Sequence, residues 1–335
     1  MYKRQGYPIN TTSNTCTITL PASASAGDTI VFADYARTWG TNKIIIDSNG
    51  LNYQGDADTS VVEYETDGQS ITITYMDSTK GWVPTIDDAV ADVPSKTGLN
   101  GIFGYGYTSS NHNMSNLVSN AGVVATDVTG VGTARRTLAA TEYGTDKGIF
   151  GYGYTSTVVS MSNLVSNTGV VATDTSGVGT SRSGLAACSY GDDKGIFGYG
   201  SAGPVSTTNL VSNTGVIGTD VSGVGTARET LAACEYGDDK GIFGYGDTGS
   251  KTAVTNLVSN TGVVATDTSG VGTARNYLAA CGYGGDKGIF GYGDTTGVSS
   301  SLTNLVSNTG VVATDTTGVG TARSGLAATQ YDGDK

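Results

Sequence analysis

The chain has 335 residues, a formal net charge of −12 and 51 glycines. The acidic balance excludes most binding to nucleic-acid backbones, because the phosphates carry charge of the same sign. The glycines show no three-residue period, so a collagen triple helix is excluded, and regular apolar segments argue against disorder. No run approaches the roughly 18 apolar residues that cross a membrane, and the first residues lack the apolar core of a secretory signal.

Residues 15–86 are expected to form a small β-domain. Four segments combine β-branched residues with flanking Gly, Asn, Asp and Ser, which is typical of strands and turns: residues 16–21, 28–33, 43–47 and 70–75. We interpret residues 1–14 as an anchoring segment. Residues 87–99, which contain DDAVADVP, are the expected linker.

The same region resembles a small β-domain of tailed-phage tail fibre proteins. The segment order is TLP, a small-residue turn with AGD, a strand, a Gly-containing turn and a final strand ending near Trp82. The likeness covers about residues 10–85. It implies a β-sandwich-like domain that attaches to other virion proteins or oligomerises, with a trimer as one option.

From residue 100 onward one sequence repeats almost unchanged. The segment GIFGYG begins at residues 101, 148, 195, 241 and 288, with spacings of 47, 47, 46 and 47 residues. In the copy that starts at Arg135, strands are expected at residues 137–143, 147–153, 162–166 and 170–174. Four short strands in about 47 residues match one blade of a β-propeller. Helices are not expected, since no apolar pattern of helical period persists.

The copies also predict how the repeats end. The first copy lacks the LAA segment that opens the others, and the chain ends with that segment at residues 326–328. We therefore expect residues 100–335 to form a five-bladed propeller, closed by a C-terminal strand that joins the first blade. The alternative is an open solenoid, which requires atypical capping repeats that the sequence does not show.

The repeat resembles the kelch-type repeat. The similarity rests on an arginine before each first strand, followed by LAA, YG, DKGIFGYG, NLV and TG. The family's tryptophan after the fourth-strand turn is absent, and FGYG replaces its glycine doublet. Repeats with this sequence also look like those of phage structural proteins. A structural role is expected for the repeated arginines: Arg135, Arg182, Arg228, Arg275 and Arg323.

The repeats differ most in sequence between their second and third strands. These connections should share one face of the ring with the blade-to-blade connections, and loops on a rigid frame are the usual place for recognition. The alternative is neutral drift of exposed loops. The candidate binding residues are Tyr107, His112, Tyr154, Ser201, Asp247, Lys251 and Asp294. Arg136, Glu229 and Tyr277 follow the repeated arginines and are expected to line the rim of a central channel.

Catalytic, cofactor and metal sites are not expected. His112 is the only histidine, so a Ser–His–Asp triad and copper chemistry lack parts. Cys188, Cys234 and Cys281 occupy a repeat position where other copies carry threonine, which indicates small packing residues rather than metal ligands.

The resulting hypothesis is a non-enzymatic phage virion protein, located in the virion. It would be a tail fibre or adhesin that recognises a host-surface glycan. The alternatives are a capsid or tail decoration protein with a purely structural role, and a cellular kelch-like or lectin-type interaction module.

Overall fold

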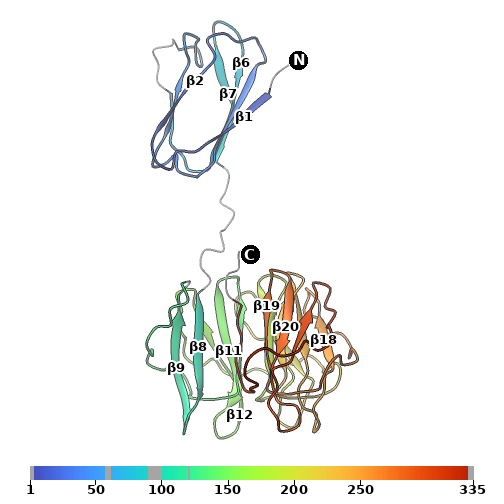
Figure 1. Cartoon of the computed structure of the whole chain (residues 1–335). Helices are drawn as coiled ribbons and strands as arrows, with labels where there is room; N and C mark the ends of the chain where they lie inside the picture. Colours follow the sequence, from blue (N-terminus) through green and yellow to red (C-terminus); the bar gives the residue numbers. More distant parts are fainter. Residues whose placement is uncertain (1–3, 57–61, 90–99, 120, 331–335) are drawn as a thin grey trace. The chain divides into compact units, whose positions relative to one another are not determined.

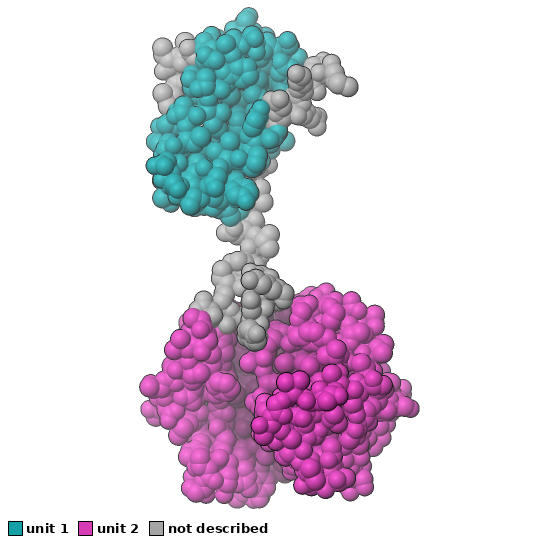
Figure 2. All heavy atoms as spheres, viewed as in Figure 1, with its two compact units in different colours: residues 1–97 teal, residues 98–335 magenta. Residues whose placement is uncertain are grey.

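The computed structural model describes residues 4–56, 62–89, 100–119 and 121–330 (Figure 1). Within these ranges the chain forms β-strands and no helix. Two compact units, residues 1–97 and 98–335, are coloured separately in Figure 2. The all-β class predicted from the sequence is therefore confirmed.

The first unit contains two sheets whose side chains share one core. Its larger sheet has the order β1-β3-β6-β7 and consists of β1 (Arg4–Ile9), β3 (Thr29–Asp34), β6 (Gln69–Tyr75) and β7 (Trp82–Ala89). Its smaller sheet has the order β2-β4-β5 and consists of β2 (Cys16–Thr19), β4 (Ile44–Asp47) and β5 (Val62–Tyr64). Residues alternate between more and less buried along β3, β4 and β6, and the inward-facing set packs around the fully buried Trp39.

All four strands predicted for this unit are confirmed as β2, β3, β4 and β6, whereas β1, β5 and β7 were not predicted. The strand β1 pairs in parallel with β3, so residues 4–9 belong to the sheet and not to a separate segment. The strand β7 pairs with β6 as far as Ala89, so the sheet extends past the expected boundary at residue 86. The rest of the expected linker, residues 90–99, lies outside the described residues.

The second unit consists of five repeat sheets, numbered here in chain order. The first holds β8 (Gly101–Tyr107) and β9 (Asn111–Val118), and the second holds β10 (Ala139–Tyr143), β11 (Lys147–Tyr154) and β12 (Val158–Val165). The third holds β13 (Ala186–Tyr190), β14 (Lys194–Gly198) and β15 (Thr208–Val211), and the fourth holds β16 (Ala232–Tyr236), β17 (Lys240–Gly244) and β18 (Thr255–Val258). The fifth holds β19 (Ala279–Tyr283), β20 (Lys287–Gly291) and β21 (Thr303–Val306), and all five sheets are antiparallel.

The fourth strand expected in each repeat is present only as isolated bridges. In the second repeat sheet Val171 bridges Val165, and Thr175 bridges Ser162. Between these two bridges the Asn163 side chain donates to the carbonyl of Ala172 at 2.9 Å. A side chain thus replaces the backbone donor, and the ladder is interrupted there. The prediction of a continuous strand at residues 170–174 was wrong for this reason.

Neighbouring repeat sheets are joined by a phenylalanine that packs on a glycine. Phe197 of the third sheet lies against Gly151 of the second, where an added Cβ would stand 2.6 Å from its ring. The same ring meets Tyr152 edge-on, with centroids 5.3 Å apart. The contact recurs between each consecutive pair of sheets, through Phe150 on Gly104, Phe243 on Gly198 and Phe290 on Gly244.

Two cysteines of the repeats, Cys188 and Cys234, lie where consecutive sheets pack together. Cys188 and Cys234 are buried and Cys281 is half-buried, and none forms a disulfide. A Cβ on Gly241 would stand 2.5 Å from the Sγ atom of Cys188, and Thr141 faces Gly195 in the same way. Burial raises the pKa of the Cys188 and Cys234 thiols. The prediction of small packing residues is therefore confirmed for Cys188 and Cys234.

The first and fifth repeat sheets each have an unmatched side, which lacks the phenylalanine–glycine contact. Phe103, the counterpart of Phe197, is 52% exposed. Gly291, the counterpart of Gly151, meets no phenylalanine. Residues 324–330 form no strand, although the Gly325 amide donates to the Tyr277 carbonyl at 2.8 Å. The expected pairing of a C-terminal strand with β8 is thus not present in the described residues.

We predict that Gly198→Ala destabilises the second unit by about 2 kcal/mol, because its new methyl group would overlap the Phe243 ring. Gly218→Ala is the matched control. The nearest atom to a Cβ on Gly218 is 3.5 Å away, and the other copies carry alanine at this position. Chemical denaturation of both variants measures the difference. Equal stability of the two variants would contradict the packing argument.

Candidate functional site

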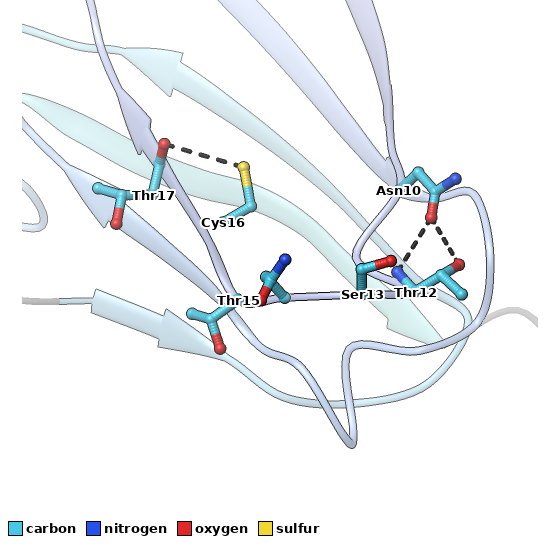
Figure 3. Close-up of a pocket in the computed structure, with 7 residues that line it drawn as sticks. Asn10, Thr12, Ser13, Thr15, Cys16 and Thr17 are labelled. Carbon is cyan, nitrogen blue, oxygen red and sulfur yellow. Dashed lines mark hydrogen bonds between the residues drawn. The ribbon is translucent and has the colours of Figure 1, made fainter.

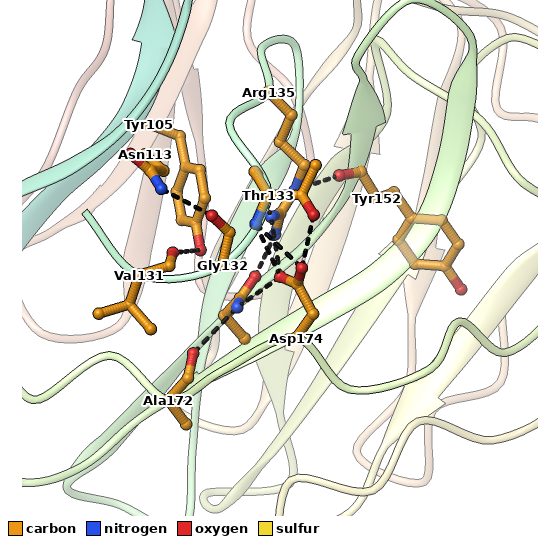
Figure 4. Close-up of polar contacts among 10 residues, drawn as sticks. Tyr105, Asn113, Val131, Gly132, Thr133, Arg135, Tyr152, Ala172 and Asp174 are labelled. Atoms are coloured by element: carbon orange, nitrogen blue, oxygen red, sulfur yellow. Dashed lines mark hydrogen bonds and ion pairs between the residues drawn. The ribbon is translucent and has the colours of Figure 1, made fainter.

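A fully buried arginine links each consecutive pair of repeat sheets. Arg135 is 0% exposed, and its guanidinium carbon lies 4.2 Å from the ring centroid of Tyr105 in the first sheet. Its Nε atom donates to the carbonyl of Tyr152 in the second sheet at 2.8 Å, as Figure 4 shows. Its Nη2 atom donates to Oδ1 of Asn163 at 2.7 Å. The arginine therefore contacts one sheet through its face and the next through its edge.

An aspartate accepts further hydrogen bonds at the same junction between sheets. The Asp174 carboxylate accepts hydrogen bonds from the Thr133 amide at 2.9 Å and the Thr133 hydroxyl at 2.6 Å (Figure 4). It also accepts one from Nδ2 of Asn163 at 2.9 Å. Burial by itself would raise the pKa of Asp174, but the bonds from Thr133 and Asn163 outweigh it, and the pKa lies below its ordinary value.

The arrangement recurs around the second unit. Arg182, Arg228 and Arg275 are also 0% exposed and bond to Asn209, Asn256 and Asn304. The corresponding threonine hydroxyls donate hydrogen bonds to Asp220, Asp267 and Asp315. Arg323 stacks on Tyr292, 4.1 Å from its centroid, but is exposed. Sequence reasoning missed the asparagines and aspartates, although each occurs at a constant place, in the NLV segment and in the ATD or GTD segment.

The variable connections of the repeats lie beside the residues that follow these arginines. Tyr154 and Arg136 exchange two backbone hydrogen bonds, with N···O distances of 2.8 and 3.0 Å. The same backbone pairing joins Ser183 to Ser201, Glu229 to Asp247 and Asn276 to Asp294. We call this set of paired positions, with the connections β8–β9, β11–β12, β14–β15, β17–β18 and β20–β21, the variable edge.

Further bonds connect the variable edge from one sheet to the next. The Gly184 amide donates to Thr137, the Thr230 amide to Gly184, and the Tyr277 amide to Thr230, at 2.7–2.9 Å. Thr137, Thr230 and Tyr277 adopt φ values of 50–53° to make these bonds. The left-handed conformation is uncommon for such residues, so the backbone here is determined by the sheet contacts and not by the local sequence.

Three of the predicted residues meet in one cluster. The guanidinium carbon of Arg136 lies 4.3 Å from the Tyr107 ring centroid and 5.1 Å from that of Tyr154. Tyr107 is 54% exposed. Tyr107 ends β8, Tyr154 ends β11 and Arg136 precedes β10, so the cluster forms only when the first two repeat sheets pack together. We call these three residues the Tyr–Arg–Tyr cluster.

The remaining predicted residues pair differently. Lys251 and Asp294 form an ion pair between the fourth and fifth sheets. Asp247 accepts from Asn276 at 3.2 Å across the same junction. Ser201 and Glu229 take part in the backbone pairing of their own sheets, and Tyr277 is 52% exposed. The candidate residues therefore form separate groups along the edge and not one site.

His112 contacts a hydroxyl group. Its Nε2 atom lies 2.7 Å from the hydroxyl oxygen of Thr108, four residues away. Within the described ranges, no group of three or more His, Cys, Asp or Glu side chains is placed to hold a metal ion. The arrangement supports binding through hydrogen bonds and ring stacking.

Two hollows occur on the described surface. One, of about 540 Å³, belongs to the first unit and is lined by residues 10 and 12–17, a single segment that Figure 3 shows bonding to itself. The other, of about 330 Å³, is lined by β8, β9 and the connection between them, including Phe103, Tyr107 and His112. This second hollow thus includes Phe103, the unmatched phenylalanine of the first repeat sheet.

Comparison with known proteins returned no match, either to a protein-family model or to a curated protein. In the described parts of the chain, no helix is long and apolar enough to cross a membrane.

We predict that the second unit loses stability as the pH falls below 3.8, the ordinary pKa of the aspartates that hold the threonines. Their pKa values are lower in the folded chain. Their contribution is therefore complete above the unfolded pKa and is lost as the pH falls through the folded pKa. The free energy of unfolding, measured at pH 7 and at lower pH, should fall less for Asp220→Asn than for the native chain. Parallel pH profiles for the two proteins would contradict this.

Proposed function

We propose that this chain is a non-enzymatic virion structural protein of a tailed phage, a tail fibre or adhesin whose variable edge recognises a host-surface glycan. The observation that carries the proposal is the internal contrast within the second unit. The stacked arginine with its asparagine partner and the phenylalanine–glycine contact recur at all four junctions between consecutive sheets, whereas the residues on one connected edge differ. Recognition residues on a constant frame are typical of binding proteins.

The proposed architecture is a five-bladed propeller in which each repeat sheet is one blade. The four contacts between consecutive repeat sheets would be blade-to-blade contacts, and the two unmatched surfaces would form a fifth. Phe103 would pack on Gly291 and beside Tyr292, while residues 326–330 would add to β8 as its missing first strand. Closure would remove an exposed sheet edge and bury an aromatic ring.

For the closed ring, Phe103→Ala should destabilise the second unit by about 3 kcal/mol, as expected for Phe197→Ala at a filled contact. In an open ring Phe103 is already half in solvent, and its truncation would change the free energy of unfolding little. Denaturant titration of the two variants decides between these states. A small effect of Phe103→Ala beside a large one of Phe197→Ala would refute closure.

For the first unit we propose attachment to other virion proteins. Its support is the resemblance noted in the sequence and a core of its own around Trp39 and Trp82, which allows the unit to act as a separate module. A homo-oligomer, with a trimer as one option, belongs to the same proposal. Weak glycan contacts would then be strengthened by multivalency.

We expect the purified protein to bind bacterial surface polysaccharides on a glycan array, and to lose this binding when its five variable connections are all given one repeat's sequence. Such a variant keeps the arginine, asparagine and phenylalanine–glycine contacts between the sheets, so its thermal unfolding should be close to that of the native chain. Undiminished binding by the variant would refute recognition through the variable edge.

A second candidate function, a capsid or tail decoration protein, is favoured by a different observation. Each repeat exposes a valine to the same extent, about 64–65%, at the position after its Asn-Thr-Gly or Asn-Ala-Gly turn: Val123, Val170, Val216, Val263 and Val311. Regularly placed exposed apolar residues mark contact surfaces. Serine at all five positions would prevent incorporation into particles if this surface mediates assembly, and would leave glycan binding unchanged.

A further inference from the structure

We propose that the Tyr–Arg–Tyr cluster is a binding subsite for a sugar that carries a carboxylate, such as a hexuronic acid. This inference rests on the proposed function and names the ligand class of one part of the variable edge. It depends on Tyr107, Arg136 and Tyr154 alone, and not on the residues of the other sheets.

The fold does not require these three side chains. At the position of Arg136 the later copies carry Ser183, Glu229, Asn276 and Ser324. At the position of Tyr107 and Tyr154 they carry Ser201, Asp247 and Asp294. Backbone pairing between these positions is nevertheless the same in the second to fifth sheets. The aromatic rings and the guanidinium are therefore additional to what holds the backbone, and only the first two sheets present them.

The Arg136 guanidinium is held in place while its hydrogen-bond donors stay available. Its face lies over the rings of Tyr107 and Tyr154, at 4.3 and 5.1 Å from their centroids. Within the described parts of the chain it forms no ion pair and no side-chain hydrogen bond. A planar guanidinium fixed by stacking directs its edge N–H groups outward, and this edge matches the two oxygens of a carboxylate.

The chain segments that follow the two tyrosines are joined by a hydrogen bond. Asn111, at the start of β9, donates from Nδ2 to the carbonyl of Thr155 at 2.8 Å, next to Tyr154. Thr155 is also held within the β11–β12 connection, where its amide donates to the carbonyl of Thr157 at 2.9 Å. Both rings are thereby positioned before a ligand arrives, which lowers the entropy lost on binding.

The chemistry of the cluster favours a single acidic sugar over other anions. Tyr107 keeps more than half of its surface exposed, so a ring face remains for the C–H groups of a pyranose. One cation meets one carboxylate, whereas the net charge of −12 opposes approach of a polyanion such as a nucleic acid. Ring stacking and charge pairing together define the expected ligand.

Ligand-observed saturation-transfer NMR on the full chain tests the subsite with methyl β-D-glucuronide and methyl β-D-galacturonide. The matched neutral probes are the methyl glucoside and galactoside, which lack only the carboxylate. We expect at least one uronide to bind about tenfold or more tightly than its neutral partner, as a charge-assisted bidentate pair requires. Equal affinity for the acidic and neutral sugars, or no binding of either uronide, would overturn the proposal.

Arg136→Ser and Tyr154→Ser place in the cluster the residues that other copies carry, so both variants should fold. Each should lose uronide binding by about tenfold or more. Glu229→Ser, the equivalent change in the fourth sheet, is the control and should bind as the native chain does. Undiminished uronide binding by Arg136→Ser would refute the subsite.

The two proposals fail in different ways. If equalising all five connections abolishes glycan-array binding while Arg136→Ser leaves it intact, recognition through the variable edge holds and the acidic-sugar subsite is overturned. If neither variant changes binding, both proposals are overturned.

Discussion

The second unit depends on a buried positive charge at each junction between sheets. An arginine that is removed from water is costly unless its donors are used and an opposite charge lies near. Arg135 meets this condition only when two sheets are in register, because Tyr105 comes from one and Tyr152 and Asn163 from the other. Desolvation lowers the pKa of the arginine, while the tyrosine ring and Asp174 act in the opposite direction. A misaligned pair of sheets would leave this charge unpaired.

The same constraint explains why sequence variety is confined. Residues in contact with the arginine, the phenylalanine ring or its glycine cannot change without strain or a cavity. At the variable edge the sheets are joined through backbone groups, as in the pairing of Glu229 with Asp247. Backbone bonds place no demand on the side chain, so arginine, serine, glutamate and asparagine all occur after the repeated arginine. Constant junctions and a changeable edge are thus two results of one mode of assembly.

Much of this could be predicted from the sequence, because near-identical copies repeat one physical solution. The strand pair around GIFGYG and the small packing site of Cys188 followed from alternation and residue size. The interruption of the fourth strand could not be predicted, since it depends on the side chain of Asn163 reaching Ala172. The strand β1 was missed because its parallel pairing with β3 is a non-local contact. Likewise, the meeting of Tyr107 with Arg136 depends on how two sheets pack and not on any local pattern.

The buried cysteines have a practical consequence. Thiolates are the reactive form, and the raised pKa of Cys188 and Cys234 keeps these groups protonated while the sheets stay packed. Cys188 lies in the third sheet, Cys234 in the fourth and Cys281 in the fifth. Alkylating reagents would therefore modify Cys188 and Cys234 only during transient opening of their own sheets. The alkylation rates of these cysteines in the native chain can therefore distinguish unfolding of one sheet at a time from unfolding of the whole unit.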